Sequence, residues 1–179
     1  NDVAPASVTN TSTASRTSMT YFASGAKGED IANYSYSYAS NGSVRSVSVS
    51  YYDNGTKRAA SATSTDKLFK SDSFRGSDAS VISTTTNRTS TTFFAQNSNF
   101  EDIADYSWSY DSTGAGIRST SVSFYGAGAN RASSAASNDR LTQSGSYFND
   151  VAVGSVTNTS TASRTSMTYF ASGAKGEDI

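Results

Sequence analysis

Hydroxyl side chains are the commonest reactive groups in this sequence, which contains 37 serines and 22 threonines among 179 residues. A serine acts as a nucleophile only when a neighbouring base activates it, and the chain has no histidine. It also has no cysteine, so disulfides, thiolate chemistry and the usual ligand sets for zinc, copper and haem are excluded. We therefore expect a protein that is not an enzyme and carries no cofactor.

Three adjacent carboxylate pairs could bind a cation such as calcium, which prefers oxygen ligands: Glu29-Asp30, Glu101-Asp102 and Glu177-Asp178. One pair supplies few of the six to eight oxygens that calcium takes. We therefore interpret these pairs as solvated turns, with no metal site. The expected outcome is that added calcium leaves the melting temperature unchanged.

Aromatic residues form the candidate ligand site. Two ladders of rings alternate with serine, and their members are Tyr34, Tyr36 and Tyr38, then Tyr106, Trp108 and Tyr110. Exposed rings in a row stack on sugars or on single-stranded bases, whereas buried rings form a core. Leu, Ile, Val and Phe together number only 26. Because the core needs these rings, we favour the core interpretation and keep glycan binding as the alternative.

Six Asn-X-Ser/Thr sequons could accept N-linked glycans on an extracellular chain: Asn10, Asn33, Asn41, Asn54, Asn87 and Asn158. O-linked glycans are an equal alternative in a chain so rich in serine and threonine.

Charge and hydropathy exclude two classes of partner. The formal net charge is −1, so the chain lacks the basic field expected of a nucleic-acid-binding protein. No apolar stretch approaches the ~18 residues of a membrane-spanning helix, so we expect no membrane insertion. The small net charge and an aromatic content of 12% favour a folded chain over a disordered one.

Internal repetition organises the sequence. Ser7–Ile31 recurs without a difference as Ser155–Ile179, and Arg16–Phe22 also aligns with Arg88–Phe94. The repeating unit is thus about 72–76 residues long. We predict unit 1 at residues 1–72, unit 2 at 73–148 and a partial unit 3 at 149–179, within a window of a longer array. Neighbouring units of the same chain are then the first expected partner.

Each unit shows a period of two, which is typical of strands. Val47, Val49 and Tyr51 alternate with serines, and Asn41-Gly42 is a signal for a hairpin turn. The pattern predicts strands near 15–24, 32–40, 43–52 and 66–75 of unit 1. The predicted fold is all-β: tandem repeats of antiparallel strands that form an elongated winding sheet or a β-solenoid-like rod. Each unit has too few apolar residues for its own core, so it must pack on its neighbours.

The serine faces of these strands have two interpretations: an uncharged surface in contact with solvent, or a flat surface that packs on another layer. Basic residues near the starts of strands could protect the sheet edges against aggregation or pair with Glu29, Asp30 or Asp53. These residues are Arg16, Arg45, Lys70, Arg88, Arg118 and Arg164.

Two Tyr-Asp turns carry a resemblance to a known family. Tyr52-Asp53-Asn54-Gly55 and Tyr110-Asp111-Ser112-Thr113-Gly114 resemble the repeats of RHS/YD proteins, which are large bacterial surface or secreted proteins. The resemblance implies antiparallel hairpins that wind into a shell or rod. The serine- and threonine-rich, nearly identical repeats are also similar to stalk regions of very large bacterial cell-surface proteins.

Together these observations predict a non-enzymatic structural protein of the cell surface or extracellular space, such as a fibre, stalk or sheath. The first alternative is an adhesin that binds carbohydrates through the ring ladders. The second is self-association of several chains into a filament.

Overall fold

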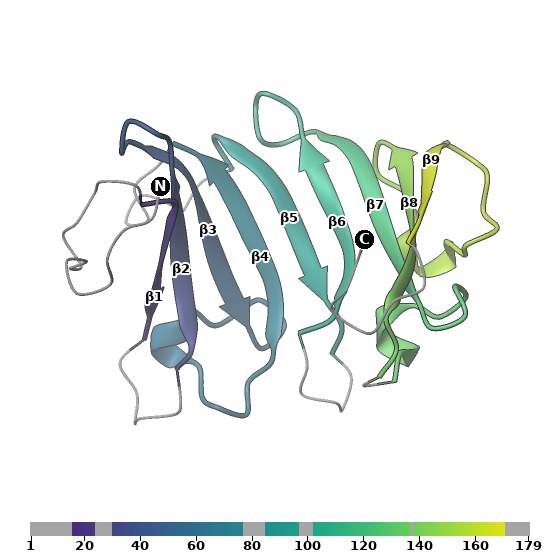
Figure 1. Cartoon of the computed structure of the whole chain (residues 1–179), viewed down its shortest axis with the longest axis horizontal. Coiled ribbons are helices and arrows are strands. Elements are labelled where there is room, and N and C mark those ends of the chain that lie inside the picture. Colours follow the sequence, from purple (N-terminus) through teal and green to yellow (C-terminus); the bar gives the residue numbers. More distant parts are fainter. Residues whose placement is uncertain (1–15, 24–29, 77–84, 97–101, 137, 171–179) are drawn as a thin grey trace.

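The computed structural model describes residues 16–23, 30–76, 85–96, 102–136 and 138–170 (Figure 1). Asn10 and the pairs containing Glu29, Glu101 and Glu177 fall partly or wholly outside these ranges. The described residues form one sheet of nine antiparallel strands in the order of the chain. The strands are β1 (Ser18–Phe22), β2 (Ala32–Tyr38), β3 (Val44–Tyr52), β4 (Leu68–Arg75), β5 (Arg88–Phe94), β6 (Ala104–Tyr110), β7 (Ile117–Tyr125), β8 (Leu141–Phe148) and β9 (Arg164–Tyr169).

The sheet is open, because β1 and β9 are its first and last strands and do not pair with each other. The described helical structure consists of three short 3-10 turns, η2 (Ala59–Ser61), η4 (Ala132–Ser134) and η5 (Val153–Ser155). The predicted all-β class and antiparallel pairing are confirmed. Within the described ranges, no helix has the length and apolar character needed to cross a membrane.

One face of the sheet, here named the ring face, carries the aromatic and aliphatic side chains. The register aligns residues of successive strands in rows across it, since paired residues point to the same side of a sheet. One row runs from β1 to β8 through Tyr21, Tyr34, Val49, Asp72, Thr91, Trp108, Thr120 and Tyr147.

The opposite face, here named the hydroxyl face, consists of serine and threonine over most of its width. One row contains Thr20, Ser35, Ser48, Ser73, Ser90, Ser109 and Ser119, and ends at Phe148 on β8. Neighbouring hydroxyls bond across strands, with Oγ–Oγ distances of 3.0 Å for Ser48–Ser73 and 3.1 Å for Ser121–Ser144. The strict alternation of the sequence therefore gives a serine-rich face and a ring face, and the ring face also carries the polar residues Asp72, Thr91 and Thr120.

Two of the core clusters lie on the ring face. The first contains Val47, Val49 and Phe74, with Tyr34, Tyr36 and Tyr51 against it. The second contains Val122, Phe124 and Tyr147. The connection from β8 to β9 covers this second cluster, because Val151, Val153 and Val156 pack on it. Each fully buried aliphatic or aromatic side chain stabilises the fold by about 1.5–3 kcal/mol.

Turn residues explain where the strands reverse. The turn between β2 and β3 closes with a bond from the Ala39 amide to the Ser43 carbonyl, 2.9 Å long. Of the Asn41-Gly42 pair, only Gly42 has a positive φ, at 80°. Asn41 instead accepts hydrogen bonds on its Oδ1 from the amide and the hydroxyl of Ser43. The hairpin prediction is confirmed, but the asparagine acts through its side chain rather than through a left-handed backbone.

The two ends of the sheet differ in what they carry. Because the strands alternate in direction, odd-numbered strands begin and even-numbered strands finish at the same end, the upper one in Figure 1. Arginines gather at this end, here named the arginine end: Arg16, Arg45, Arg75, Arg88, Arg118 and Arg164. The longer connections β3–β4 and β7–β8, with their 3-10 turns, lie at the opposite, lower end.

Candidate functional site

The first ring ladder lies on β2 and is half-buried. Tyr34 stacks on Tyr21 of β1, with 4.7 Å between ring centroids and 21° between ring planes. Tyr36 meets the edge of Tyr34 at 5.4 Å and lies 6.2 Å from Tyr38. The structure therefore adds a ring of the preceding strand, Tyr21, to the three predicted residues.

The second ladder, on β6, repeats this arrangement. Tyr106 stacks on Phe93 of β5 at 4.4 Å, and Trp108 contacts both rings edge-on at 4.7 and 5.6 Å. Burial raises the pKa of the Tyr106 hydroxyl. Tyr110 is 8% exposed and takes part in the core. Edge-on packing holds the ladder rings against one another, as aromatic pairs in cores do.

A buried carboxylate lies between the two ladders. Asp72 of β4 is 4% exposed, and it accepts a hydrogen bond from the Thr91 hydroxyl at 2.5 Å. Its second oxygen lies 2.9 Å from the Lys70 ammonium, which neutralises the charge. The Thr91 hydroxyl also lies 3.1 Å from that of Tyr110. Lys70 therefore pairs with its own strand neighbour and not with the carboxylates considered from the sequence.

The last tyrosine of each ladder is covered by one arginine. The Arg88 guanidinium lies 3.8 Å from the Tyr110 ring centroid, and its Nε donates to the Gly114 carbonyl at 3.2 Å. Arg16 occupies the same place over Tyr38 at 5.3 Å. The sequence analysis missed these stacks, although both pairs have the same spacing along the chain. A groove of about 400 Å³ beside Tyr110 is also lined by Arg75, Arg88 and Arg118.

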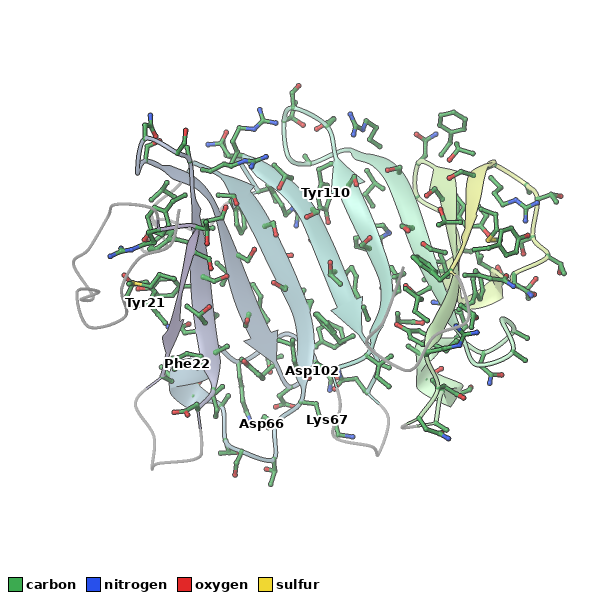
Figure 2. All side chains as sticks on the ribbon, viewed as in Figure 1. Tyr21, Phe22, Asp66, Lys67, Asp102 and Tyr110 are labelled. Carbon is green, nitrogen blue, oxygen red and sulfur yellow. The ribbon has the colours of Figure 1, made fainter. Side chains whose placement is uncertain are left out.

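The lower end holds a cavity of about 280 Å³ whose lining includes Asp30, Asp66 and Asp102. Figure 2 shows Asp66, Lys67 and Asp102 together there, far from Tyr110. Asp66 is paired with Lys57 at 2.9 Å, and hydrogen bonds from Lys57 and Thr63 lower its pKa. Burial raises the pKa of Asp102. No group of three metal-ligating side chains occurs among the residues that the structure describes.

Ion pairs between described residues gather mainly at this lower end. Lys57 also approaches Asp53 at 3.2 Å, and Arg131 holds Asp105 at 2.8 Å. In the first half of the chain, the corresponding contact joins Arg58 to the Oδ1 of Asn33 at 2.9 Å. The two arginine contacts fasten the β3–β4 and β7–β8 connections to the starts of β2 and β6.

The sequons lie at different kinds of places. Asn41, Asn54 and Asn87 are exposed in turns, and Asn87 also lines the groove beside Tyr110. Asn158 is half-buried in the β8–β9 connection, and Asn33 is held by Arg58 at the start of β2. Asn10 lies outside the described residues. Among the described sequons, the three turn asparagines are therefore the exposed ones.

Comparison of the chain with protein-family models, with curated proteins and with solved structures finds no match to any of them.

Proposed function

We propose that this chain is a non-enzymatic structural element of the cell surface or extracellular space, in which tandem units lengthen one winding sheet. One observation carries the proposal. Arg164–Tyr169, which forms β9 at the end of the sheet, has the same sequence as Arg16–Tyr21, whose segment forms β1. β9 therefore presents, on its open edge, the same residues that β1 uses to pair with β2.

The observed pairing of β1 predicts what that edge accepts. In β1, Met19 pairs with Tyr36 and Tyr21 with Tyr34. The matching residues of β9 are Met167 and Tyr169, and Tyr169 is 71% exposed. A following strand with the sequence of Ala32–Tyr38 would pair with β9 in the same register and cover its tyrosine. Each added unit thus buries rings that the previous unit leaves exposed.

The composition fits a mechanical role. The hydroxyl face offers neutral, cross-bonded serines, and histidine and cysteine are absent from the sequence. Main-chain hydrogen bonds along the sheet and ring packing between units supply the cohesion. The similarity to stalk regions of bacterial surface proteins supports the proposed location.

The experiment extends the chain by a copy of residues 32–76 after Ile179. We expect the outward amides of β9 to become protected from hydrogen exchange and the melting temperature to rise. The matched control carries the same extension with the counterparts of Tyr34, Tyr36 and Tyr38 replaced by serine. If β9 amides exchange equally fast in both chains, the proposal is wrong.

Self-association into a filament is the competing arrangement, because open strand edges can pair between chains. Sedimentation of the chain over a hundredfold range of concentration separates the two. A single-chain array predicts one species throughout, whereas a filament predicts growth with concentration.

A further inference from the structure

The charges of the molecule are distributed unequally between the two ends of the sheet. The arginine end carries six arginines, and the described acidic residues near it are Asp111 and Asp150. At the lower end, the lysines and arginines are outnumbered by aspartates, which are Asp30, Asp53, Asp66, Asp102, Asp105 and Asp139. The ion pairs of Lys57 with Asp53 and Asp66, and of Arg131 with Asp105, join charges at the lower end.

Four arginines of this end carry charges that no described carboxylate pairs with. Among the described residues, no ion pair involves Arg45, Arg88, Arg118 or Arg164. Arg45 and Arg118 are exposed. The carboxylate of Asp111, the acidic residue on the groove, accepts hydrogen bonds from the amide and hydroxyl of Thr113 in its own turn. Like charges held this close raise the local potential and attract an anion.

Spacing gives this surface the form of a row. Five of the arginines lie on β3, β4, β5, β7 and β9, and Arg16 lies just before β1. Neighbouring strands are about 4.8 Å apart. The backbone positions of these arginines therefore form a row of about 40 Å along the end of the sheet, one or two strands apart. Arg88 is held in place by Tyr110 and Gly114, so part of the row is ordered before any ligand arrives.

We propose that the arginine end binds a linear anionic polysaccharide that lies across the strands. Guanidinium groups bind carboxylate and sulfate through paired hydrogen bonds, and the groove of about 400 Å³ between Arg75, Arg88 and Arg118 accepts one such group. Ser109, Ser112 and Thr89 on the same groove supply hydrogen-bonding partners for sugar hydroxyls. This site is separate from the ring ladders and does not depend on how the sheet is lengthened.

A single-stranded nucleic acid is the less suitable polyanion. Such strands bind through stacking of bases on open aromatic faces as well as through charge. At this end, the rings of Tyr38 and Tyr110 are already covered by Arg16 and Arg88. The surface thus offers charges and hydroxyls for a polyanion, and its nearest rings are occupied.

The test measures binding of fluorescent dextran sulfate and polygalacturonate to the full chain by polarisation, with neutral dextran and oligothymidylate as comparisons. We expect both anionic polysaccharides to bind and neutral dextran to fail. The double variant Arg45→Gln/Arg118→Gln should bind about tenfold more weakly at about 50 mM salt, with a shallower salt dependence. The matched control, Lys67→Gln/Arg140→Gln, removes the same charge at the lower end.

Each other outcome overturns the proposal. An equal loss of affinity in the control variant would mean that binding depends on the net charge of the chain and not on the arginines of this end. Tighter binding of oligothymidylate than of either polysaccharide would assign the surface to nucleic acid. Failure of both anionic polysaccharides to bind a chain with unchanged circular dichroism would eliminate the site. None of these results bears on hydrogen exchange at β9, so the proposed structural role is tested separately.

Discussion

Two corresponding regions of the ring face solve the same packing problem with different residues. In the region of β4 and β5, a polar network of Lys70, Asp72 and Thr91 lies beside the buried ring of Phe74. In the region of β8 and β9, the corresponding residues are Gln143, Gly145, Tyr147 and Met167.

The two regions differ in which of two neighbouring positions on the strand carries the larger side chain. A Cβ at Gly145 would lie 2.9 Å from the Tyr147 hydroxyl. The hydroxyl of the tyrosine thus fills the space that the Asp72 side chain needs in the first region, where Phe74 is shorter by that oxygen. The exchange has a cost, because the Tyr147 hydroxyl is buried without a hydrogen-bond partner among the described residues. The same strand pattern can therefore contain two different sets of buried side chains, provided that neighbouring positions change together.

The largest expected effect comes from placing the first region's carboxylate in the second. Gly145→Asp should lower the free energy of unfolding by about 3–5 kcal/mol, since the new charge is buried without a lysine to pair with. Urea denaturation measures this loss. Gly145→Ala is the control, because it adds the Cβ without the charge.

The full exchange tests whether the four positions act as a set. Adding Gln143→Lys, Tyr147→Phe and Met167→Thr to Gly145→Asp should recover most of the lost stability. If the quadruple variant is no more stable than Gly145→Asp alone, the two regions are not interchangeable and the comparison fails.

A smaller loss is expected from Asp72→Ala in the first region. Thr91 loses its acceptor and Lys70 its counter-charge, so the free energy of unfolding should fall by about 1–3 kcal/mol. Thermal and urea unfolding measure it. Gln143→Ala, at the position matching Lys70, should change stability by less, and an equal loss there would contradict the assigned network.

Removing the unpartnered hydroxyl should stabilise the second region. Tyr147→Phe is expected to raise the free energy of unfolding by about 1 kcal/mol, because burial of that hydroxyl is not compensated by a hydrogen bond. Tyr110→Phe is the control, since the Tyr110 hydroxyl bonds to Thr91 and its loss should destabilise. A loss of stability in Tyr147→Phe would show that its hydroxyl is satisfied in solution.

The smallest effects concern the turns at the lower end, where the regions also differ. Asp66 accepts a hydrogen bond from the Thr63 amide and pairs with Lys57. Asp139 accepts one from the Ala136 amide, and the position of Lys57 is occupied by Asn130. Asn130→Lys should raise stability by no more than about 0.5 kcal/mol, as for other exposed pairs. A rise in melting temperature at neutral pH that disappears in concentrated salt checks this.

The ion pair between Lys57 and Asp66 makes the stability of the fold depend on pH. The folded-state pKa of Asp66 lies below its ordinary value of 3.8, so its contribution is present above that pH and is lost as pH falls through the folded-state pKa. The raised pKa of Lys57 keeps the pair charged on the alkaline side. Melting curves between pH 6 and pH 2 should show a smaller acid-induced decrease for Asp66→Asn than for the unmodified chain. Equal decreases would contradict the assignment.

Much of the fold follows from local sequence pattern. The alternation of Val47, Val49 and Tyr51 with serine places one strand and both of its faces, and the observed β3 matches the predicted range within one residue. The hairpin at Gly42 follows from the positive φ that the turn requires at this position, which glycine adopts without strain. The ladder rings were found for the same reason, since alternation marks one face of a strand. The division into units at residues 72 and 148 stays a prediction.

The contacts of Arg88 with Tyr110 and of Asp72 with Thr91, which the sequence analysis missed, join residues on different strands. Arg88 and Tyr110 meet because β5 and β6 pair in one register, and no local pattern states that register. Asp72 is read from the sequence as one more polar residue, yet pairing with Thr91 places it in the ring row and buries it.

The amino-acid sequence by itself determined the period, the strands, the two chemically distinct faces and the direction changes, because each depends on neighbours within a few residues. Only the tertiary structure decided which rings stack, which carboxylate is buried and that six arginines gather at one end of the sheet. These features depend on strand register and strand order, which bring together residues from distant parts of the chain.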